Sequence, residues 1–128
     1  MTKNPISVVI ADDQSLFREI ARGMFEADGE FEVVAEAVDG IEAIAAYERT
    51  KPDLVLIDIQ MARMNGLEAA RRILESDPNA RVVLISMRAD PEYERVAREI
   101  GVIGFVAKRD LDPSALKSLV AETRAQAA

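Results

Sequence analysis

Four charged residues stand where short apolar runs of the chain end. Asp12 and Asp13 follow the first run, Asp58 follows the third, and Lys108 follows the fifth. The chain of 128 residues contains no His and no Cys, which excludes imidazole chemistry, a cysteine nucleophile and a thiolate zinc site. Any chemistry of this chain must therefore use carboxylates, hydroxyls and lysine.

Carboxylates that lie close together need a positive partner. Two such charges about 5 Å apart repel each other by roughly 3 kcal/mol at an effective dielectric constant of about 20. Either a divalent metal ion or Lys108 could offset this repulsion. Because the ligands would all be oxygen atoms, the pattern favours Mg²⁺ or a similar hard cation such as Mn²⁺.

Five short apolar runs, rich in β-branched residues, alternate with five segments of helical spacing. The runs cover residues 8–11, 31–35, 54–57, 82–85 and 104–107. Three of them are apolar throughout, as is typical of strands covered on both faces of a parallel sheet. The alternation predicts an α/β, flavodoxin-like fold: a (βα)5 open parallel sheet of strand order 2-1-3-4-5, with helices on both faces. In this order the first and third strands are neighbours, so the three aspartates should meet at one edge of the sheet.

Helix boundaries are also marked in the sequence. Two residues stand three positions before a Glu and two precede a proline, which predicts four N-caps. These residues are Asp39, Asn65, Asp90 and Asp112. Gly29 and Gly101 stand where helices should end.

Length and composition bound the class of protein. The length allows one domain, residues 1–128 with a core of about residues 5–125. The net charge of −7 argues against direct nucleic-acid binding by this chain. Residues 1–6 do not form a secretory signal, and no stretch is long and apolar enough to span a membrane. We therefore expect a cytoplasmic protein without a membrane contact.

Ser86 follows the fourth run, where its hydroxyl could donate to an anion above the sheet. Each candidate residue also has a purely structural interpretation. The aspartate pair could cap a helix, Asp58 could cap a loop, Lys108 could be solvated, Ser86 could bond to nearby backbone, and Phe105 could be a core aromatic. The joint placement of charged groups at three strand ends favours the functional interpretation.

Four segments resemble the signature blocks of one family. VVIADDQSLFRE, LVLIDIQMARMNGLEA, VVLISM and GFVAKRD are similar, in order and spacing, to the receiver domain of two-component response regulators, over essentially the whole chain. ADDQSLFRE and SMRADPEY are most similar to NarL/FixJ-type receivers, which precede a LuxR-type helix-turn-helix.

The resemblance implies a role for each residue of the acidic cluster. Asp58 would be the phosphoacceptor. Asp13 and Asp58 would bind Mg²⁺ directly, Asp12 would act through water, and the backbone carbonyl of Gln60 would complete the protein ligands.

The resemblance also implies a switch. Lys108 would pair with the phosphoryl oxygens, Ser86 would donate its hydroxyl to them, and Phe105 would be the aromatic switch residue. Gln60, Met87 and Arg88 would flank the phosphoryl group, and we expect Gln60 and Arg88 to tune the lifetime of the acyl phosphate. The output surface would be helix four, strand five and helix five. We expect it to include Tyr93, Phe105 and Leu116 or their neighbours.

The implied partner is a sensor histidine kinase or a phosphotransfer protein, and a homodimer is consistent with the family. The chain would catalyse only its own phosphorylation and dephosphorylation. It would regulate transcription through an output domain outside this chain, or act alone by protein contact.

Several residues depart from the commoner family pattern. Ala62, Arg63 and Asn65 replace the usual Pro, Gly and Asp after the acceptor, which predicts a looser loop. Met87 stands where a small residue is usual and could crowd the site or change how Ser86 moves. Arg109 replaces a proline that often follows a cis bond, and we predict a trans bond here because a cis non-proline bond costs about 3–4 kcal/mol.

Three other functions fit less well. A haloacid-dehalogenase-type phosphatase needs a second Asp as general acid where this chain has Gln60, an amide that cannot donate a proton. A flavodoxin needs a hydroxyl-rich and glycine-rich phosphate loop where this chain has DDQS. A receiver-like domain that only binds partners would not need the acidic trio together with Ser86 and Lys108.

Overall fold

The five predicted strands form one parallel sheet. The computed structural model describes residues 4–88 and 90–127; residues 1–3, 89 and 128 lie outside this part, so the N-terminal stretch 1–6 is described only from residue 4. The strands are β1 (Ile6–Ala11), β2 (Phe31–Ala37), β3 (Leu54–Asp58), β4 (Val82–Ser86) and β5 (Gly104–Ala107). Their order is β2-β1-β3-β4-β5, and every neighbouring pair is parallel, so the predicted fold is confirmed.

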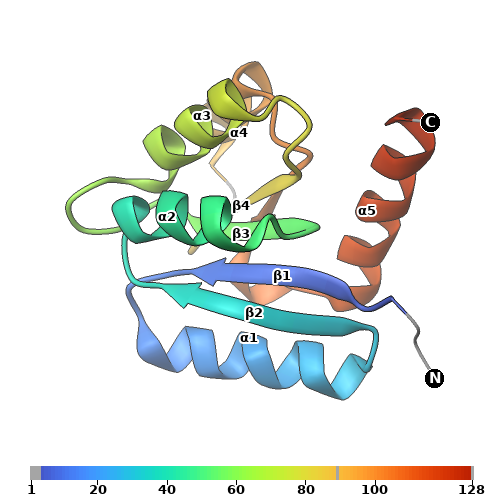
Figure 1. Cartoon of the computed structure of the whole chain (residues 1–128). Helices are drawn as coiled ribbons and strands as arrows, with labels where there is room; N and C mark the ends of the chain where they lie inside the picture. The colour runs from blue at the N-terminus through green and yellow to red at the C-terminus, as the bar shows by residue number, and fades with distance from the viewer. Residues whose placement is uncertain (1–3, 89, 128) are drawn as a thin grey trace.

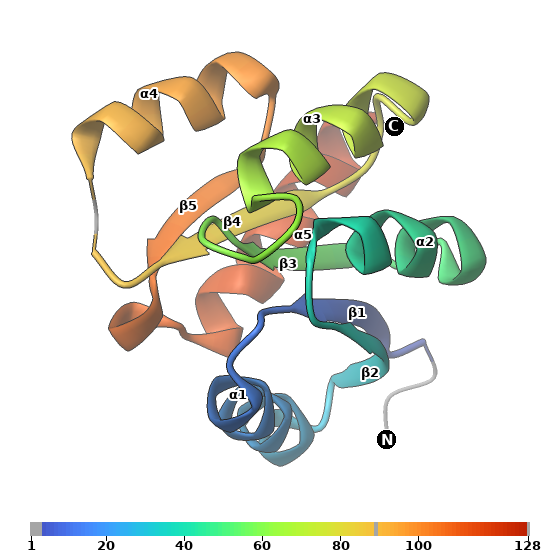
Figure 2. The same ribbon diagram turned by 90° about the vertical axis from the view of Figure 1, so that its left-hand side faces the viewer.

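Helices cover both faces of the sheet (Figures 1 and 2). They are α1 (Ser15–Asp28), α2 (Gly40–Thr50), α3 (Gly66–Ser76), α4 (Pro91–Ile100), the short 3-10 helix η1 (Lys108–Asp110) and α5 (Pro113–Ala127). Alternate strand residues point to opposite sides. Val9 therefore packs in the core under α2, α3 and α4, whereas Val8 and Ile10 pack in the core under α1 and α5.

Four of the five strands extend beyond the apolar runs, and β3 and β4 do so by one polar residue each. Asp58 and Ser86 are themselves the last residues of β3 and β4. At the opposite end, β1 includes Ser7, whose backbone N–H and hydroxyl donate to Oδ2 of Asp53 at 2.9 and 3.1 Å. These hydrogen bonds satisfy polar groups that would otherwise interrupt an apolar strand.

The four predicted N-caps are confirmed. Each side chain accepts a hydrogen bond from a backbone N–H two or three residues later, at 2.9–3.1 Å. The pairs are Asp39 with Glu42, Asn65 with Glu68, Asp90 with Glu92, and Asp112 with Ser114. Gly29 and Gly101 end α1 and α4 with left-handed backbone, and the described residues contain no cis peptide bond, as predicted for Arg109.

The structure corrects the expected output surface. Leu116 is only 1% exposed and lies in the core under α1 and α5, because it belongs to the apolar stripe that attaches α5 to the sheet. Tyr93 and Phe105 are half-buried and pack on the opposite side, with the core under α2, α3 and α4. Leu116 therefore cannot share a surface with them.

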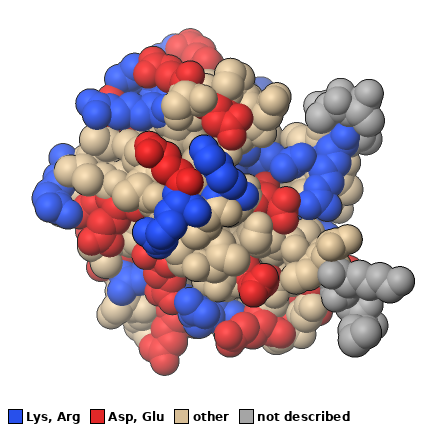
Figure 3. Space-filling view, viewed as in Figure 1, with Lys and Arg blue, Asp and Glu red and all other residues tan. Residues whose placement is uncertain are grey.

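Charged side chains are spread over the surface. On the face shown in Figure 3, basic and acidic groups are interspersed. Elsewhere in the structure, ion pairs form along a helix, such as Arg95 with Glu99 and Arg98 with Glu94 in α4. Within residues 4–88 and 90–127, no helix combines the length and the apolar character needed to cross a membrane.

Gly66 fixes the end of β3 against the start of α3. Its N–H donates to the carbonyl oxygen of Ile59 at 2.8 Å, and a Cβ added to Gly66 would overlap the carbonyl oxygen of Asp58. Only glycine allows this close approach. The backbone of Asp58 is therefore held directly by the first residue of α3.

We predict that Gly66→Ala lowers the free energy of unfolding by about 2–3 kcal/mol, because the added methyl group must push α3 away from β3. The matched control is Gly23→Ala in α1, where an added Cβ has no heavy atom within 4 Å. That variant should gain about 0.5–1 kcal/mol from helix propensity. Urea unfolding followed by circular dichroism measures both, and equal effects of the two substitutions would contradict the packing argument.

Candidate functional site

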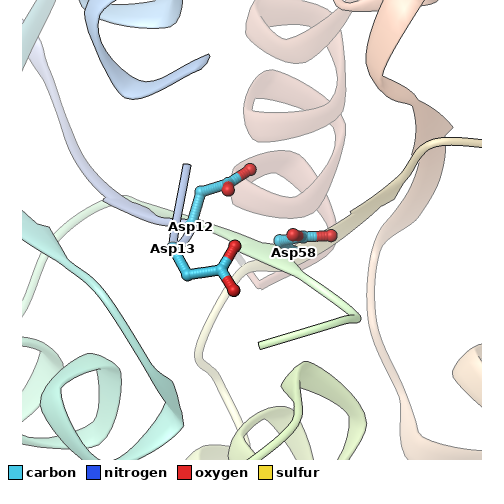
Figure 4. A group of neighbouring side chains, drawn as sticks. All are labelled: Asp12, Asp13 and Asp58. Atoms are coloured by element: carbon cyan, nitrogen blue, oxygen red, sulfur yellow. The ribbon is translucent and has the colours of Figure 1, made fainter. Parts of the chain in front are cut away.

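The three aspartates meet at the end of β1 and β3 (Figure 4). Carboxylate oxygens of Asp12, Asp13 and Asp58 all lie within 4.8 Å of one another. The strands are neighbours, with Ala11 opposite Ile57, so the residues that follow come together. The convergence expected from the sequence is observed, whereas the individual roles stay predictions.

Two of these carboxylates are buried, and Asp13 is exposed. Asp12 is 0% and Asp58 is 5% exposed. Oδ1 of Asp12 accepts a hydrogen bond from the backbone N–H of Gln14 at 2.8 Å. Gln14 is the residue before α1. Asp12 therefore shapes the turn that leads into the helix and does not cap the helix itself.

Lys108 offsets the repulsion between the buried aspartates. Its Nζ lies 2.7 Å from Oδ2 of Asp12 and 3.4 Å from Oδ2 of Asp58. Oδ2 of Asp12 has no hydrogen bond from any described residue, so the contact with the ammonium is an ion pair whose direction does not suit a hydrogen bond. The amide oxygen of Gln14 and the ring of Phe17 also contact Lys108. The sequence analysis missed both residues, although each follows the aspartate pair within a few positions of the sequence.

Burial raises the pKa of Asp58 to about 6, and the negative charge of Asp12 acts in the same direction. The ammonium of Lys108 and the backbone N–H of Gln60, at 3.3 Å, lower the pKa of Asp58 and oppose this effect. Asp58 is therefore mostly ionised at neutral pH, but at a cost in free energy.

The carboxylate of Asp58 opens into a cavity of about 540 Å³, lined by Asp13, Gln60, Met87 and Lys108 among others. An anionic group in this cavity would reach the nucleophilic oxygen of Asp58 and the ammonium of Lys108 together. The arrangement suits transfer of a group to a carboxylate, which needs orientation and charge compensation more than acid–base chemistry.

The proposed switch residues lie outside this cavity. Ser86 is 8% exposed, and its Oγ accepts from the backbone N–H of Arg88 at 3.4 Å. It lines a neighbouring cavity of about 520 Å³ together with Gln60 and Met87. Phe105 lines a third cavity, of about 260 Å³, beside α4. Met87 is 65% exposed and lines the cavities of both Asp58 and Ser86, so its effect on the site stays a prediction.

The loop after Asp58 contacts the start of α2, and the expectation of a looser loop stays a prediction. Arg63 has a φ of 64° at the position where the family commonly has glycine, and its guanidinium donates to Oδ2 of Asp39, from Nε at 2.7 Å. The carbonyl oxygen of Met64 accepts from the N–H of Gly40 at 3.0 Å. These contacts to the start of α2 therefore stabilise the left-handed backbone of Arg63, which glycine would adopt without strain.

The acidic cluster fits a hard divalent cation. All its donors are oxygen atoms within a shared space, which suits Mg²⁺ or Mn²⁺. Lys108 supplies one positive charge beside the three carboxylates, so a net negative charge remains that a cation can offset. The residues present therefore match the chemistry of a metal site.

Comparison with known proteins identifies the family. The sequence model of the response regulator receiver domain matches residues 8–121. The chain belongs to this family. The uncharacterized transcriptional regulatory protein YxjL of Bacillus subtilis (strain 168) is 36% identical over 127 residues, which cover 99% of this chain and 58% of that protein. The transcriptional regulatory protein DegU of Brevibacillus brevis is 36% identical over 116 residues, covering 91% of this chain and 49% of that protein.

A solved structure supports the same family. The signal receiver domain of NarL from Mycobacterium tuberculosis superposes with a TM-score of 0.85 at 30% identity, and the alignment covers 94% of this chain and 98% of that one. The predicted likeness to NarL-type receivers of two-component systems is confirmed. This receiver domain spans about half the length of YxjL and DegU.

We predict that Asp58→Asn stabilises the protein at neutral pH in the absence of divalent cations. Because the folded-state pKa of Asp58, about 6, lies above the ordinary value of 3.8, the native protein binds more protons between these values and loses stability as the pH rises through this window. The variant should exceed the wild type by up to about 3 kcal/mol above pH 6, and the difference should vanish below about pH 4.

Urea unfolding at a series of pH values measures this difference. Asp110→Asn is the control, because Asp110 is exposed in η1 and its replacement should change stability by less than about 0.5 kcal/mol. A constant difference between wild type and Asp58→Asn at every pH would show that the burial of this charge is not its cause.

Proposed function

We propose that this receiver domain accepts a phosphoryl group on Asp58 and changes a surface in response. The observation behind the proposal is the position of Asp58, a buried strand-end carboxylate that opens into a cavity between Asp13 and Lys108. The donor would be a sensor histidine kinase or a phosphotransfer protein. The chain would catalyse only its own phosphorylation and dephosphorylation.

In the proposed reaction a carboxylate oxygen of Asp58 attacks phosphorus. The new P–O bond forms as the bond from phosphorus to the donor breaks, which is P–N for a phosphohistidine and P–O for acetyl phosphate. Lys108, 3.4 Å from Asp58, supplies positive charge to the phosphoryl oxygens. Gln60 is an amide, so the site has no second acid at this position and gives no support to the phosphatase alternative.

Asp13 and Asp58 would hold Mg²⁺ or Mn²⁺ directly, with Asp12 acting through water and the carbonyl of Gln60 as a further ligand. When bound, the cation neutralises charge that develops on the phosphoryl oxygens. The oxygen-only donor set, whose three carboxylates have one ammonium group beside them, supports this assignment.

Phosphorylation would bias a two-state element. The carboxylate of Asp58 becomes an acyl phosphate with a charge near −2 and three strong acceptor oxygens. Ser86 would exchange its bond from the N–H of Arg88 for donation to these oxygens. The movement of β4 would open space for Phe105, which already borders a cavity beside α4. Gln60, Met87 and Arg88 would flank the phosphoryl group, and Gln60 and Arg88 would tune its lifetime.

The signalling surface would comprise α4 and β5 together with the exposed side of α5. Because YxjL and DegU are named as transcriptional regulatory proteins, we propose that the signal regulates transcription through an output domain. Homodimer formation, cytoplasmic localisation, the absence of direct nucleic-acid binding and the domain limits of about residues 5–125 stay predictions.

Acetyl phosphate with Mg²⁺ tests the acceptor. Wild type and Asp110→Asn should each gain one phosphoryl group, whereas Asp58→Asn should gain none, because the amide nitrogen and oxygen cannot form the acyl phosphate. Intact mass spectrometry measures the product. A gain in Asp58→Asn would place the acceptor elsewhere.

Binding of Mg²⁺ separates the roles of the charged residues. We predict that Mg²⁺ raises the melting temperature of the wild type, since a ligand that binds only the native state stabilises it. Asp13→Asn should abolish most of this increase. Lys108→Ala should retain it, because removing a neighbouring positive charge cannot weaken cation binding, but should slow phosphorylation. Loss of the Mg²⁺ effect in Lys108→Ala would require new roles for these residues.

A further inference from the structure

Two uncharged groups from the first turn of α1 hold Lys108, in addition to the aspartates. Its Nζ lies 2.9 Å from Oε1 of Gln14 and 4.7 Å from the centre of the Phe17 ring. We propose that Gln14 and Phe17 are positioning residues, which keep the ammonium of Lys108 beside Asp58 and thereby set the rate at which Asp58 is phosphorylated. This inference rests on the proposed function.

The local sequence explains why both groups face Lys108. Gln14 and Phe17 are three residues apart, so they lie on the same side of the first helical turn. Gln14 is the N-cap residue of α1, yet its side chain makes no capping hydrogen bond, and its amide oxygen accepts from Lys108 instead. Phe17 is half-buried against the core under α1 and α5, which fixes the orientation of its ring.

Lys108 needs such partners because its surroundings do not all favour a cation. The start of a helix has a partial positive charge, and the first turn of α1 itself contains no acidic residue, so only Asp12 and Asp13 before Gln14 oppose this charge locally. A lysine side chain also loses considerable rotamer entropy when it is held in one place. The amide oxygen of Gln14 and the negative face of the Phe17 ring attract the ammonium, whose side chain is only 8% exposed.

The absence of formal charge on Gln14 and Phe17 matters for the reaction. An acidic partner at either position would compete with an incoming phosphoryl group for the ammonium of Lys108. Uncharged partners hold the ammonium 3.4 Å from Asp58 and leave its charge available. Asp12, at 2.7 Å, would then be the one ion-pair partner whose hold on Lys108 must weaken as the phosphoryl group arrives.

A spectroscopic experiment tests the contact directly. The ε-CH₂ protons of a lysine above an aromatic ring are shifted upfield by the ring current. We expect this shift for Lys108 in the wild type, in Phe17→Tyr, which keeps a ring, and in Leu16→Ala, which removes an exposed neighbour. In Phe17→Leu the shift should disappear. If the ε-CH₂ resonance of Lys108 in the wild type showed no upfield shift, the proposal would be overturned, and this measurement requires no variant.

Rates of phosphorylation by acetyl phosphate with Mg²⁺ test the consequence. We expect Phe17→Leu to be slowed about threefold to tenfold, with Mg²⁺ bound no more weakly than by the wild type. Phe17→Tyr and Leu16→Ala should react at the wild-type rate. Gln14→Leu, which removes the acceptor at an exposed position, should also be slowed and provides the test if Phe17→Leu does not fold.

The outcomes separate this inference from the proposed function. A wild type that gains no phosphoryl group would overturn both. A wild type that is phosphorylated on Asp58, together with unchanged rates in Phe17→Leu and Gln14→Leu, would overturn the positioning role alone. An equal loss of rate in Phe17→Tyr and Phe17→Leu would also overturn it, because the retained ring would then have no effect.

Discussion

Repulsion between two buried carboxylates is the constraint on which the site depends. Asp12 and Asp58 are almost fully buried, and neither can move away, because each is fixed by the end of a central strand. Burial first, and the charge of Asp12 second, raise the pKa of Asp58, and the ammonium of Lys108 only partly opposes them. The unfavourable free energy of these buried charges is of the kind that a bound cation would relieve.

The backbone around Asp58 is held from several directions. Gly66 presses the start of α3 against the carbonyl of Asp58, and the pairing of Arg63 with Asp39 fastens the following loop to α2. A left-handed backbone costs a residue other than glycine about 1–2 kcal/mol in general. For Arg63, the hydrogen bond to the buried carboxylate of Asp39 offsets this cost. Rigid placement of this kind suits a reaction that depends on the position of the acceptor more than on proton transfer.

Separation of the switch residues from the acceptor is consistent with a two-state device. Ser86 and Phe105 line different cavities from Asp58, and both of these cavities are also lined by residues of α4. Because Leu116 is buried on the opposite side of the sheet, the changes would be transmitted through the α4 side and not through the attached side of α5.

The sequence alone determined the sheet order, the helix caps and the meeting of three aspartates, because apolar runs, capping residues and the neighbouring ends of parallel strands follow local rules. It also indicated the family through four segments. Only the tertiary structure decided which carboxylates are buried, that Gln14 and Phe17 contact Lys108, and that Arg63 pairs with Asp39. These contacts join residues up to 94 positions apart, and they depend on how helices and loops pack, which no local pattern specifies.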